Sequence, residues 1–164
     1  MKIALIGLGN PIVGDDAIGI RTIEYIRDAF EIPTNVDVIP DVSSAGIGLV
    51  ELFRGYNKVI IVDSIQTGQN KPGHVLKLKP EEIATALHVS DYHNMDFFTA
   101  LEFANEMYND IPKDITIIGI EIINVLEFSD NFSKEIQDKF EEIVTQVYKM
   151  ILQELREEIK ANVI

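Results

Sequence analysis

Two adjacent carboxylates, Asp15 and Asp16, follow a glycine-containing turn in the stretch KIALIGLGNPIVGDDAIGI near the start of the chain. An apolar run into Gly-Leu-Gly is how a dinucleotide-binding loop begins, but that loop needs a third small residue where this chain has Ile12. Pro11 has no N–H to offer a phosphate, and two negative charges near the helix start disfavour pyrophosphate. We therefore interpret the stretch as a turn that presents a carboxylate to a cation.

Two further residue types support a cation site. Asp63 ends the apolar run KVIIVD, and His88 and His93 lie in the polar stretch HVSDYHN between two expected helices. One of these histidines would complete an Asp/Asp/His set with Asp16 and Asp63. The chain has no Cys, so such a site offers oxygen and nitrogen ligands suited to Zn, Ni, Mn or Fe. The same groups also suit acid–base chemistry.

These residues also have an alternative interpretation in which their role is only structural. Asp15 is a reasonable helix N-cap, and Asp16 would then be a first-turn residue favoured by the helix dipole by about 0.3–1 kcal/mol. Histidines in loops are often only solvated, and we interpret His74 as a surface or packing residue. The functional reading depends on whether Asp16, Asp63 and a histidine meet in space.

The elements that must position these residues alternate between strand and helix. Apolar or alternating runs predict strands at 2–7, 35–39, 58–63, 74–79 and 114–120. Helical periodicity predicts helices at 16–30, 46–54, 80–87 and 94–108, and a terminal helix that starts after Ser133 as N-cap and continues to near the chain end. This order predicts a three-layer α/β/α sandwich with a mostly parallel sheet.

In a parallel sheet, ligands bind beyond the carboxyl ends of the strands. The predicted strands deliver the segment from Gly7 to Asp16, the segment from Asp41 to Gly46, and the pair Asp63-Ser64 to that edge. We therefore expect a group of carboxylates at one edge of the sheet.

Composition limits the kind of protein. With 164 residues and 46% hydrophobic residues, the chain is expected to form a single domain over 1–164. Its 27 acidic and 14 basic residues give a net charge of −13, which argues against nucleic acid and anionic membranes as partners. The start shows no signal peptide pattern and no run approaches a membrane span, so we expect a cytoplasmic protein.

Several of these stretches together resemble a known family. The stretch GLGNPIVGDDAIGI resembles the N-terminal signature of the hydrogenase maturation endopeptidases, and the likeness continues through KVIIVDSI, SDYHNMDFFTALEF and the terminal helix. The signature positions that match are Gly7, Gly9, Asn10, Asp15, Asp16, Ala17 and Gly19.

The resemblance implies a fold and an activity. It implies a mixed five-stranded sheet, of the phosphorylase/hydrolase-like kind, with HVLKLK as the one antiparallel strand. The implied activity is an aspartyl-type endopeptidase that removes the C-terminal extension of a [NiFe]-hydrogenase large-subunit precursor after nickel insertion. Asp16, Asp63 and His93 would contact nickel carried by the substrate, and Asp16 is our first choice as general base. A monomer is plausible.

Two departures from the family pattern concern the segments after the second and last strands. Where the family often has an Asp-Gly-Gly-Thr loop, this chain has Asp41 followed by Val42-Ser43-Ser44, which affects substrate positioning more than metal contact. Near Ile122, where the family usually shows a proline, this chain has none.

Two alternatives stay open. The letters GLGNP also open the peptidyl-tRNA hydrolases, but that family's Arg-His-Asn segment with its catalytic histidine is missing here, and a charge of −13 does not suit tRNA. The other alternative is a non-catalytic module that senses or holds metal-loaded hydrogenase precursor without cutting it.

Overall fold

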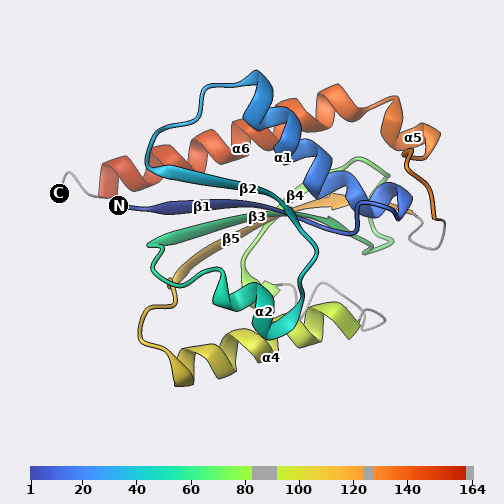
Figure 1. The fold of residues 1–164 in the computed structure, drawn as a ribbon. Coiled ribbons are helices and arrows are strands. Elements are labelled where there is room, and N and C mark those ends of the chain that lie inside the picture. Colours follow the sequence, from blue (N-terminus) through green and yellow to red (C-terminus); the bar gives the residue numbers. More distant parts are fainter. Residues whose placement is uncertain (83–91, 124–127, 162–164) are drawn as a thin grey trace.

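The computed structural model describes residues 1–82, 92–123 and 128–161, and for 92–96 and 157–161 it describes the backbone alone. Within these ranges one five-stranded sheet forms the middle layer (Figure 1). Its strands are β1 (Ile3–Leu8), β2 (Val36–Val42), β3 (Lys58–Ile65), β4 (Val75–Leu78) and β5 (Asp114–Glu121). The five predicted strands and the three-layer α/β class are confirmed, although β2 runs to Val42 and not only to the predicted end at 39.

The strand order is β2-β1-β3-β5-β4. Neighbouring strands among β1, β2, β3 and β5 pair in parallel, and β4 pairs antiparallel with β5, as the resemblance implied for HVLKLK. The chain moves from β1 to one side for β2 and then to the other side for β3, so the switch point of the topology lies between β1 and β3. We call the edge where the four parallel strands end the carboxyl edge, and the opposite edge the amino edge.

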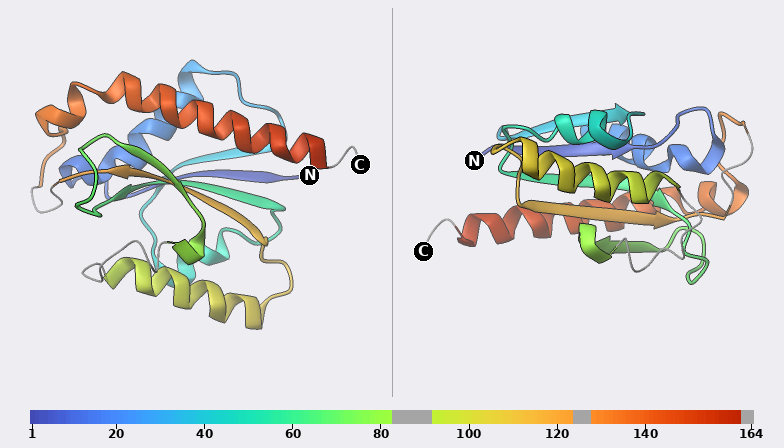
Figure 2. Two further views of the ribbon diagram at one scale, coloured as in Figure 1. Left: turned by 180° about the vertical axis from the view of Figure 1, so that it is seen from behind. Right: turned by 90° about the horizontal axis from the view of Figure 1, so that it is seen from below.

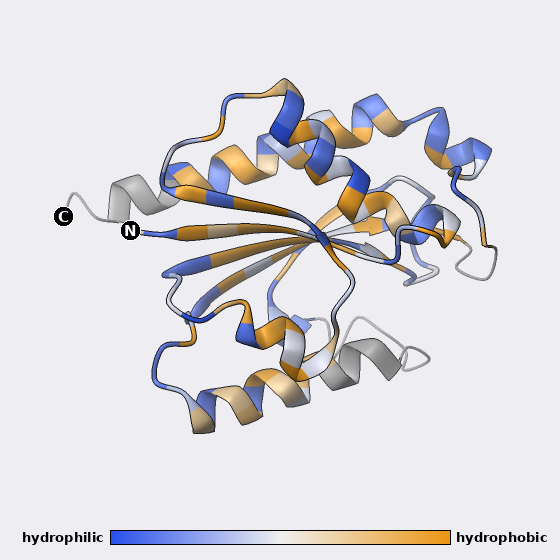
Figure 3. Ribbon diagram, viewed as in Figure 1, coloured by the Kyte–Doolittle hydropathy of each residue, from blue (hydrophilic) through white to orange (hydrophobic). Residues whose placement is uncertain are grey.

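Helices cover both faces of the sheet (Figures 1 and 2). One face carries α1 (Ile18–Ala29), α5 (Lys134–Gln137) and α6 (Phe140–Ala161), and the other carries α2 (Gly46–Glu51) and α4 (Tyr92–Met107). Each face has its own apolar cluster, one joining the sheet to α1 and α6 and one joining it to α2 and α4. Because both faces are covered, the central strands are apolar along almost their whole length, as Figure 3 shows.

Several element boundaries differ from the prediction. The first helix is preceded by a separate 3₁₀ turn, η1 (Gly14–Ala17). The predicted terminal helix is divided into α5 and α6, although its predicted N-cap is confirmed, because the hydroxyl of Ser133 accepts the N–H of Ile136. Of the helix predicted at 80–87, only 80–82 lies in the described part, and it is helical. In the described ranges, no helix is long and apolar enough to cross a membrane.

Candidate active site

A cleft of about 420 Å³ opens at the carboxyl edge, beside the ends of β1 and β3. This is the switch point of the sheet, where open α/β proteins bind their ligands. The cleft is lined by the loop after β1, the loop after β2, the end of β3 and the side chain of Phe97 from α4. Asp16 and Asp63 both line it, at the sheet edge where the sequence predicts a group of carboxylates.

The loop after β1 turns back tightly on itself, and two glycines make this possible. Gly9 has a φ of +146°, and a Cβ on it would overlap the carbonyl oxygen of Asp16. A Cβ on Gly19 would overlap the carbonyl oxygen of Val62 in β3. The motif glycines therefore let η1 and α1 pack directly against the strand ends, which carries Asp16 to the cleft.

Most backbone donors of this loop already have acceptors within the protein. Gly9 donates its N–H to the carbonyl of Val42, and Gly14 donates to that of Ser129. The N–H groups of Asn10, Ile12 and Val13 also have protein acceptors, and Pro11 has no N–H. A nucleotide loop needs these donors free to hold pyrophosphate, so the geometry agrees with the interpretation that this loop is not a nucleotide cradle.

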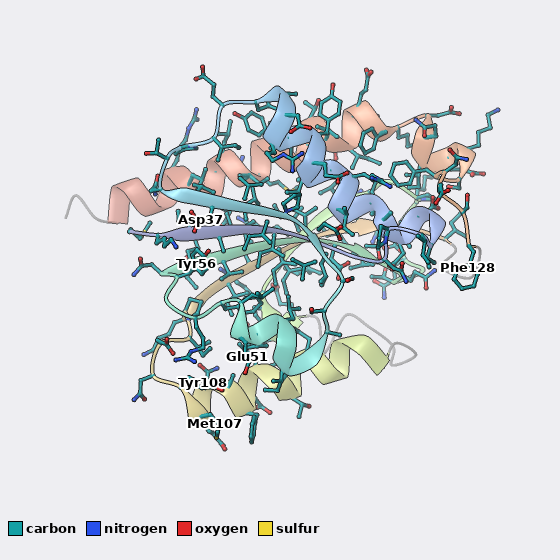
Figure 4. All side chains as sticks on the ribbon, in the orientation of Figure 1. Asp37, Glu51, Tyr56, Met107, Tyr108 and Phe128 are labelled. Carbon is teal, nitrogen blue, oxygen red and sulfur yellow. The ribbon has the colours of Figure 1, made fainter. Side chains whose placement is uncertain are left out.

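A second segment anchors the loop from outside. Val13 pairs with Ser129 in an isolated bridge, and Ser129 also donates its N–H to the carbonyl of Ile12 at 3.1 Å. The neighbouring Phe128 is 84% exposed and lies at the outer end of this edge (Figure 4). The chain just before the last helices thus fixes the turn that carries the two aspartates.

Asp16 is half-buried, and both of its carboxylate oxygens accept hydrogen bonds. The N–H of Asn10 donates to Oδ2 at 3.0 Å, and the hydroxyl of Ser64 donates to Oδ1 at 2.6 Å. Both donors come from the cleft lining. They hold the carboxylate in one orientation, and each oxygen keeps lone pairs for a further partner.

Asp15 has a different environment from its neighbour. It is 3% exposed, and its Oδ1 accepts the N–H of Ser133 at 2.7 Å. The structure thus replaces the expectation that Asp15 caps its own helix, because η1 has no side-chain cap and Asp15 instead binds the residue that caps α5. Asp15 links the turn after β1 to the start of α5.

Asp63 lies within β3, which continues to Ile65 instead of ending at residue 63 as predicted. Its Oδ1 accepts the N–H of Ser64 at 2.7 Å. Ser64 therefore contacts both carboxylates, one through its hydroxyl and the other through its backbone. The sequence places Ser64 at this edge directly after Asp63, but its hydroxyl contact with Asp16 follows only from the fold.

The structure describes the side chains of only some of the remaining candidate site residues. His93 lies in α4, four residues before the cleft-lining Phe97, but its side chain is outside the described part. His88 lies outside the described residues altogether. His74 is exposed, as predicted. Asp41 is exposed within β2 and is not among the described residues that line the cleft.

The charge of the cleft is negative. Among the described residues that line it, Asp16 and Asp63 are the ionisable ones, and Lys and Arg are absent. No group of three or more His, Asp or Glu side chains in the described part is arranged to hold a metal ion. Two carboxylates are oxygen donors that fit a divalent cation, and a third ligand would have to come from outside this set.

The two departures from the family pattern have visible structural contexts. Ser43 and Ser44 are exposed and line the cleft beside α2. Ile122 is 2% exposed and donates its N–H to the carbonyl of Ile65 at 2.9 Å. A proline at position 122 has no N–H and could not make this hydrogen bond.

Glu121, next to Ile122, organises the loop after β3. It is 1% exposed, and its carboxylate accepts hydrogen bonds from the N–H and the hydroxyl of Thr67 and from the N–H of Gly68, at 2.7–2.9 Å. The same loop carries Gln66, which lines the cleft. Glu121 thus supports one wall of the site from behind.

The fold and the site together define an α/β sandwich protein with an acidic cleft at its topological switch point. The sequence model of the hydrogenase maturation protease family matches residues 20–154. The chain therefore belongs to the hydrogenase maturation protease family. The matched range includes Asp63 and His93 and begins just after the turn that carries Asp16.

Individual relatives agree with this assignment. The chain is 31% identical over 124 residues to the hydrogenase 2 maturation protease of Escherichia coli K12, a match that covers 73% of each chain. The hydrogenase maturating endopeptidase HybD from E. coli superposes with a TM-score of 0.78 at 27% identity, covering 96% of this chain and 94% of that one. HybD from Thermococcus kodakarensis shares the fold, with a TM-score of 0.70 at 22% identity over 92% of this chain and 99% of that one.

Proposed function

We propose that this chain removes the C-terminal extension of a [NiFe]-hydrogenase large-subunit precursor once nickel has been inserted. Asp16, Asp63 and His93 would recognise the nickel ion that the substrate carries. The observation that carries the proposal is the meeting of Asp16 and Asp63 in one cleft whose described lining holds no Lys or Arg.

The ligand set suits nickel chemistry. Carboxylate oxygens and an imidazole nitrogen are ligands that Ni²⁺ accepts in proteins. His93 would supply the nitrogen, and its place one helical turn before Phe97 in α4 supports this role. A cleft of about 420 Å³ is in the size range of small-ligand pockets. It would therefore take a short segment of the precursor with its metal, while the rest of the precursor stays outside.

Cleavage itself would use the substrate's nickel as a Lewis acid. A metal ion polarises a nearby carbonyl or lowers the pKa of a bound water, and either effect promotes hydrolysis without a Ser or Cys nucleophile. Asp16 and Asp63 are the ionisable side chains in the described lining, and of these two Asp16 remains our candidate general base. Recognition of nickel by the same groups would make cleavage a check on correct metal loading.

The test is to incubate the purified chain with nickel-loaded and nickel-free precursor and to weigh both products by intact-mass spectrometry. We expect loss of the extension from the nickel-loaded precursor alone. Truncation of both samples would show that the site does not recognise nickel. A stable complex with no truncation in either sample would favour the non-catalytic binding module. Asp138→Asn, an exposed carboxylate outside the described cleft lining, is the matched control and should process like the unmodified chain.

A further inference from the structure

We propose that Ser64 is a positioning residue, whose hydroxyl fixes the carboxylate of Asp16 in the orientation that the metal-bearing substrate meets. This inference rests on the proposed function. Its starting point is the 2.6 Å distance between the Ser64 hydroxyl and Oδ1 of Asp16. That distance is typical of a hydrogen bond from a hydroxyl to an ionised carboxylate, which is about twice as strong as a neutral one.

The two donors to Asp16 come from different elements. Asn10 belongs to the loop after β1 and donates its backbone N–H to Oδ2, whereas Ser64 belongs to β3 and donates its side-chain hydroxyl to Oδ1. Asp16 itself lies in η1. With both bonds in place the carboxylate is held at both oxygens. With the Asn10 bond alone, it is free to turn about its terminal torsion, which has only broad preferences.

Ser64 is well placed to act as a fixed support. It lies in β3, between β1 and β5 in the sheet, and it pairs in register with Ile120. Its N–H donates to Oδ1 of Asp63 while its hydroxyl donates to Asp16. One residue on a central strand therefore sets the relation between the two carboxylates of the cleft, which a mobile loop residue would not do.

Groups that orient metal-contacting side chains contribute strongly without touching the metal. Removal of such a partner typically costs about 10–100-fold in metal affinity or activity. The alanine and threonine substitutions separate this role from simple packing. Ser64→Ala removes the hydroxyl, whereas Ser64→Thr keeps it and adds a β-branched side chain that strands accommodate well.

The experiment compares the unmodified chain, Ser64→Ala and Ser64→Thr by three measurements. These are the kcat and KM for processing of nickel-loaded precursor, the affinity of the free protein for Ni²⁺ by calorimetry, and the thermal unfolding midpoint. We expect Ser64→Ala to lower kcat and weaken Ni²⁺ binding by about 10–100-fold with an unfolding midpoint close to the original. Ser64→Thr should recover both to within about threefold. Thr145→Ala removes a hydroxyl that bonds to a helix carbonyl on α6 and should change none of the three.

The outcomes separate this inference from the proposed function. Processing and Ni²⁺ binding of Ser64→Ala at the original level would overturn the positioning role alone. A large fall in the unfolding midpoint that Ser64→Thr does not restore would also overturn it, because the role would then be structural. If the unmodified chain binds Ni²⁺ but processes neither precursor, the proposed function fails, and the Ni²⁺ affinities of the variants still decide the role of Ser64. Failure of the unmodified chain in both measurements would overturn both.

Discussion

At the amino edge of the sheet, Lys58 and Asp114 begin neighbouring strands side by side, and their side chains form an ion pair at 2.8 Å. At the carboxyl edge of the same sheet, Asp16 and Asp63 line a cleft whose described lining holds no cationic side chain. The amino edge thus pairs acidic with basic side chains inside the protein, whereas the described lining of the cleft at the carboxyl edge brings together two carboxylates and no Lys or Arg.

The charged side chains at the amino edge form one connected network of ion pairs. Glu154 of α6 is 2% exposed and pairs with Lys58 at 2.7 Å and with Lys77 at 2.9 Å. Lys79 pairs with Asp114 at 3.1 Å. The hydroxyl of Thr116 adds a 3.0 Å hydrogen bond to Glu154.

A separate hydrogen bond lies at this same end of the molecule, where Tyr56 donates its hydroxyl to Asp37 at 2.8 Å (Figure 4).

The difference separates charge that is paired inside the fold from charge that lines the cleft. A buried charge is tolerated only when it is paired and hydrogen-bonded, and the amino edge satisfies both conditions. At the carboxyl edge the donors to Asp16 are neutral groups that orient the carboxylate without cancelling its charge. Such a site remains attractive to a cation. Substitutions at the two edges should therefore affect different properties.

The largest expected effect is on processing. Asp16→Asn keeps the shape of the side chain but removes its charge, so processing of nickel-loaded precursor should fall by roughly 10³-fold or more, equal to about 4 kcal/mol. The unfolding midpoint should change little because Asp16 is only half-buried. Processing kinetics and thermal unfolding of the same preparation check both parts. Full activity in this variant and in His93→Ala would reject the site assignment.

The next largest effect is on stability at the opposite edge. Lys58→Met leaves the buried Glu154 without its nearest cation, and removal of one partner of a buried pair costs about 3–5 kcal/mol. Urea unfolding measures the change, and the processing rate per folded molecule should stay the same. Lys2→Met is the matched control, because the ion pair of Lys2 with Asp37 is solvent-exposed and should matter little. A small change in Lys58→Met would mean that Lys77 compensates for the loss.

The twin aspartates give a smaller effect that tests the comparison within a single turn. Asp15→Ala leaves the N–H of Ser133 without its acceptor, which should cost about 1–3 kcal/mol of stability. Asp15→Asn keeps an acceptor oxygen and should recover most of this loss. Both variants should process precursor once folded. If Asp15→Asn instead abolishes processing while the protein stays folded, the division of roles between Asp15 and Asp16 is wrong.

The smallest effect is the dependence of stability on pH, because titration removes charge and leaves the side chains in place. Burial raises the pKa of Glu154, but hydrogen bonds from Lys58 and Lys77 outweigh it and hold this pKa below the ordinary 4.5. Burial likewise lowers the pKa of Lys58, but hydrogen bonds to Asp114 and Glu154 raise it above the ordinary 10.5. These directions define the pH range in which the network stabilises the fold.

The contribution of Glu154 should be complete above pH 4.5 and lost as the pH falls through its lowered folded-state pKa. The contribution of Lys58 should be complete below pH 10.5 and lost as the pH rises through its raised folded-state pKa. Urea unfolding across pH measures both limits. Glu154→Gln should reduce the loss of unfolding free energy at acidic pH. An unchanged dependence of stability on acidic pH in that variant would contradict the assignment.

Much of this architecture was predictable from the sequence. The apolar runs of β1, β3 and β5 and the alternation of strand and helix follow from burial on both faces of a parallel sheet. The rule that ligands bind beyond the carboxyl ends of the strands then predicted the region of the cleft and a group of carboxylates there, from which the resemblance selected Asp16 and Asp63. The limits of the elements were less predictable. For example, β3 runs two residues past Asp63 because its pairing with β5 continues to Ile65 and Glu121.

The sequence by itself determined the strands, the layers and the edge of the sheet at which carboxylates gather, because hydrophobic periodicity and the alternation of strand and helix are local properties of the chain. The resemblance named Asp16, but only the tertiary structure decided how the twin aspartates divide, with Asp16 in the cleft and Asp15 buried against Ser133. This division depends on partners far away in sequence. Ser133 donates a hydrogen bond to Asp15 at a separation of 118 residues, and Ser64 donates one to Asp16 at a separation of 48. Hydrogen bonds between such distant residues leave no local pattern in the chain. They form only after folding has brought the strands and loops together.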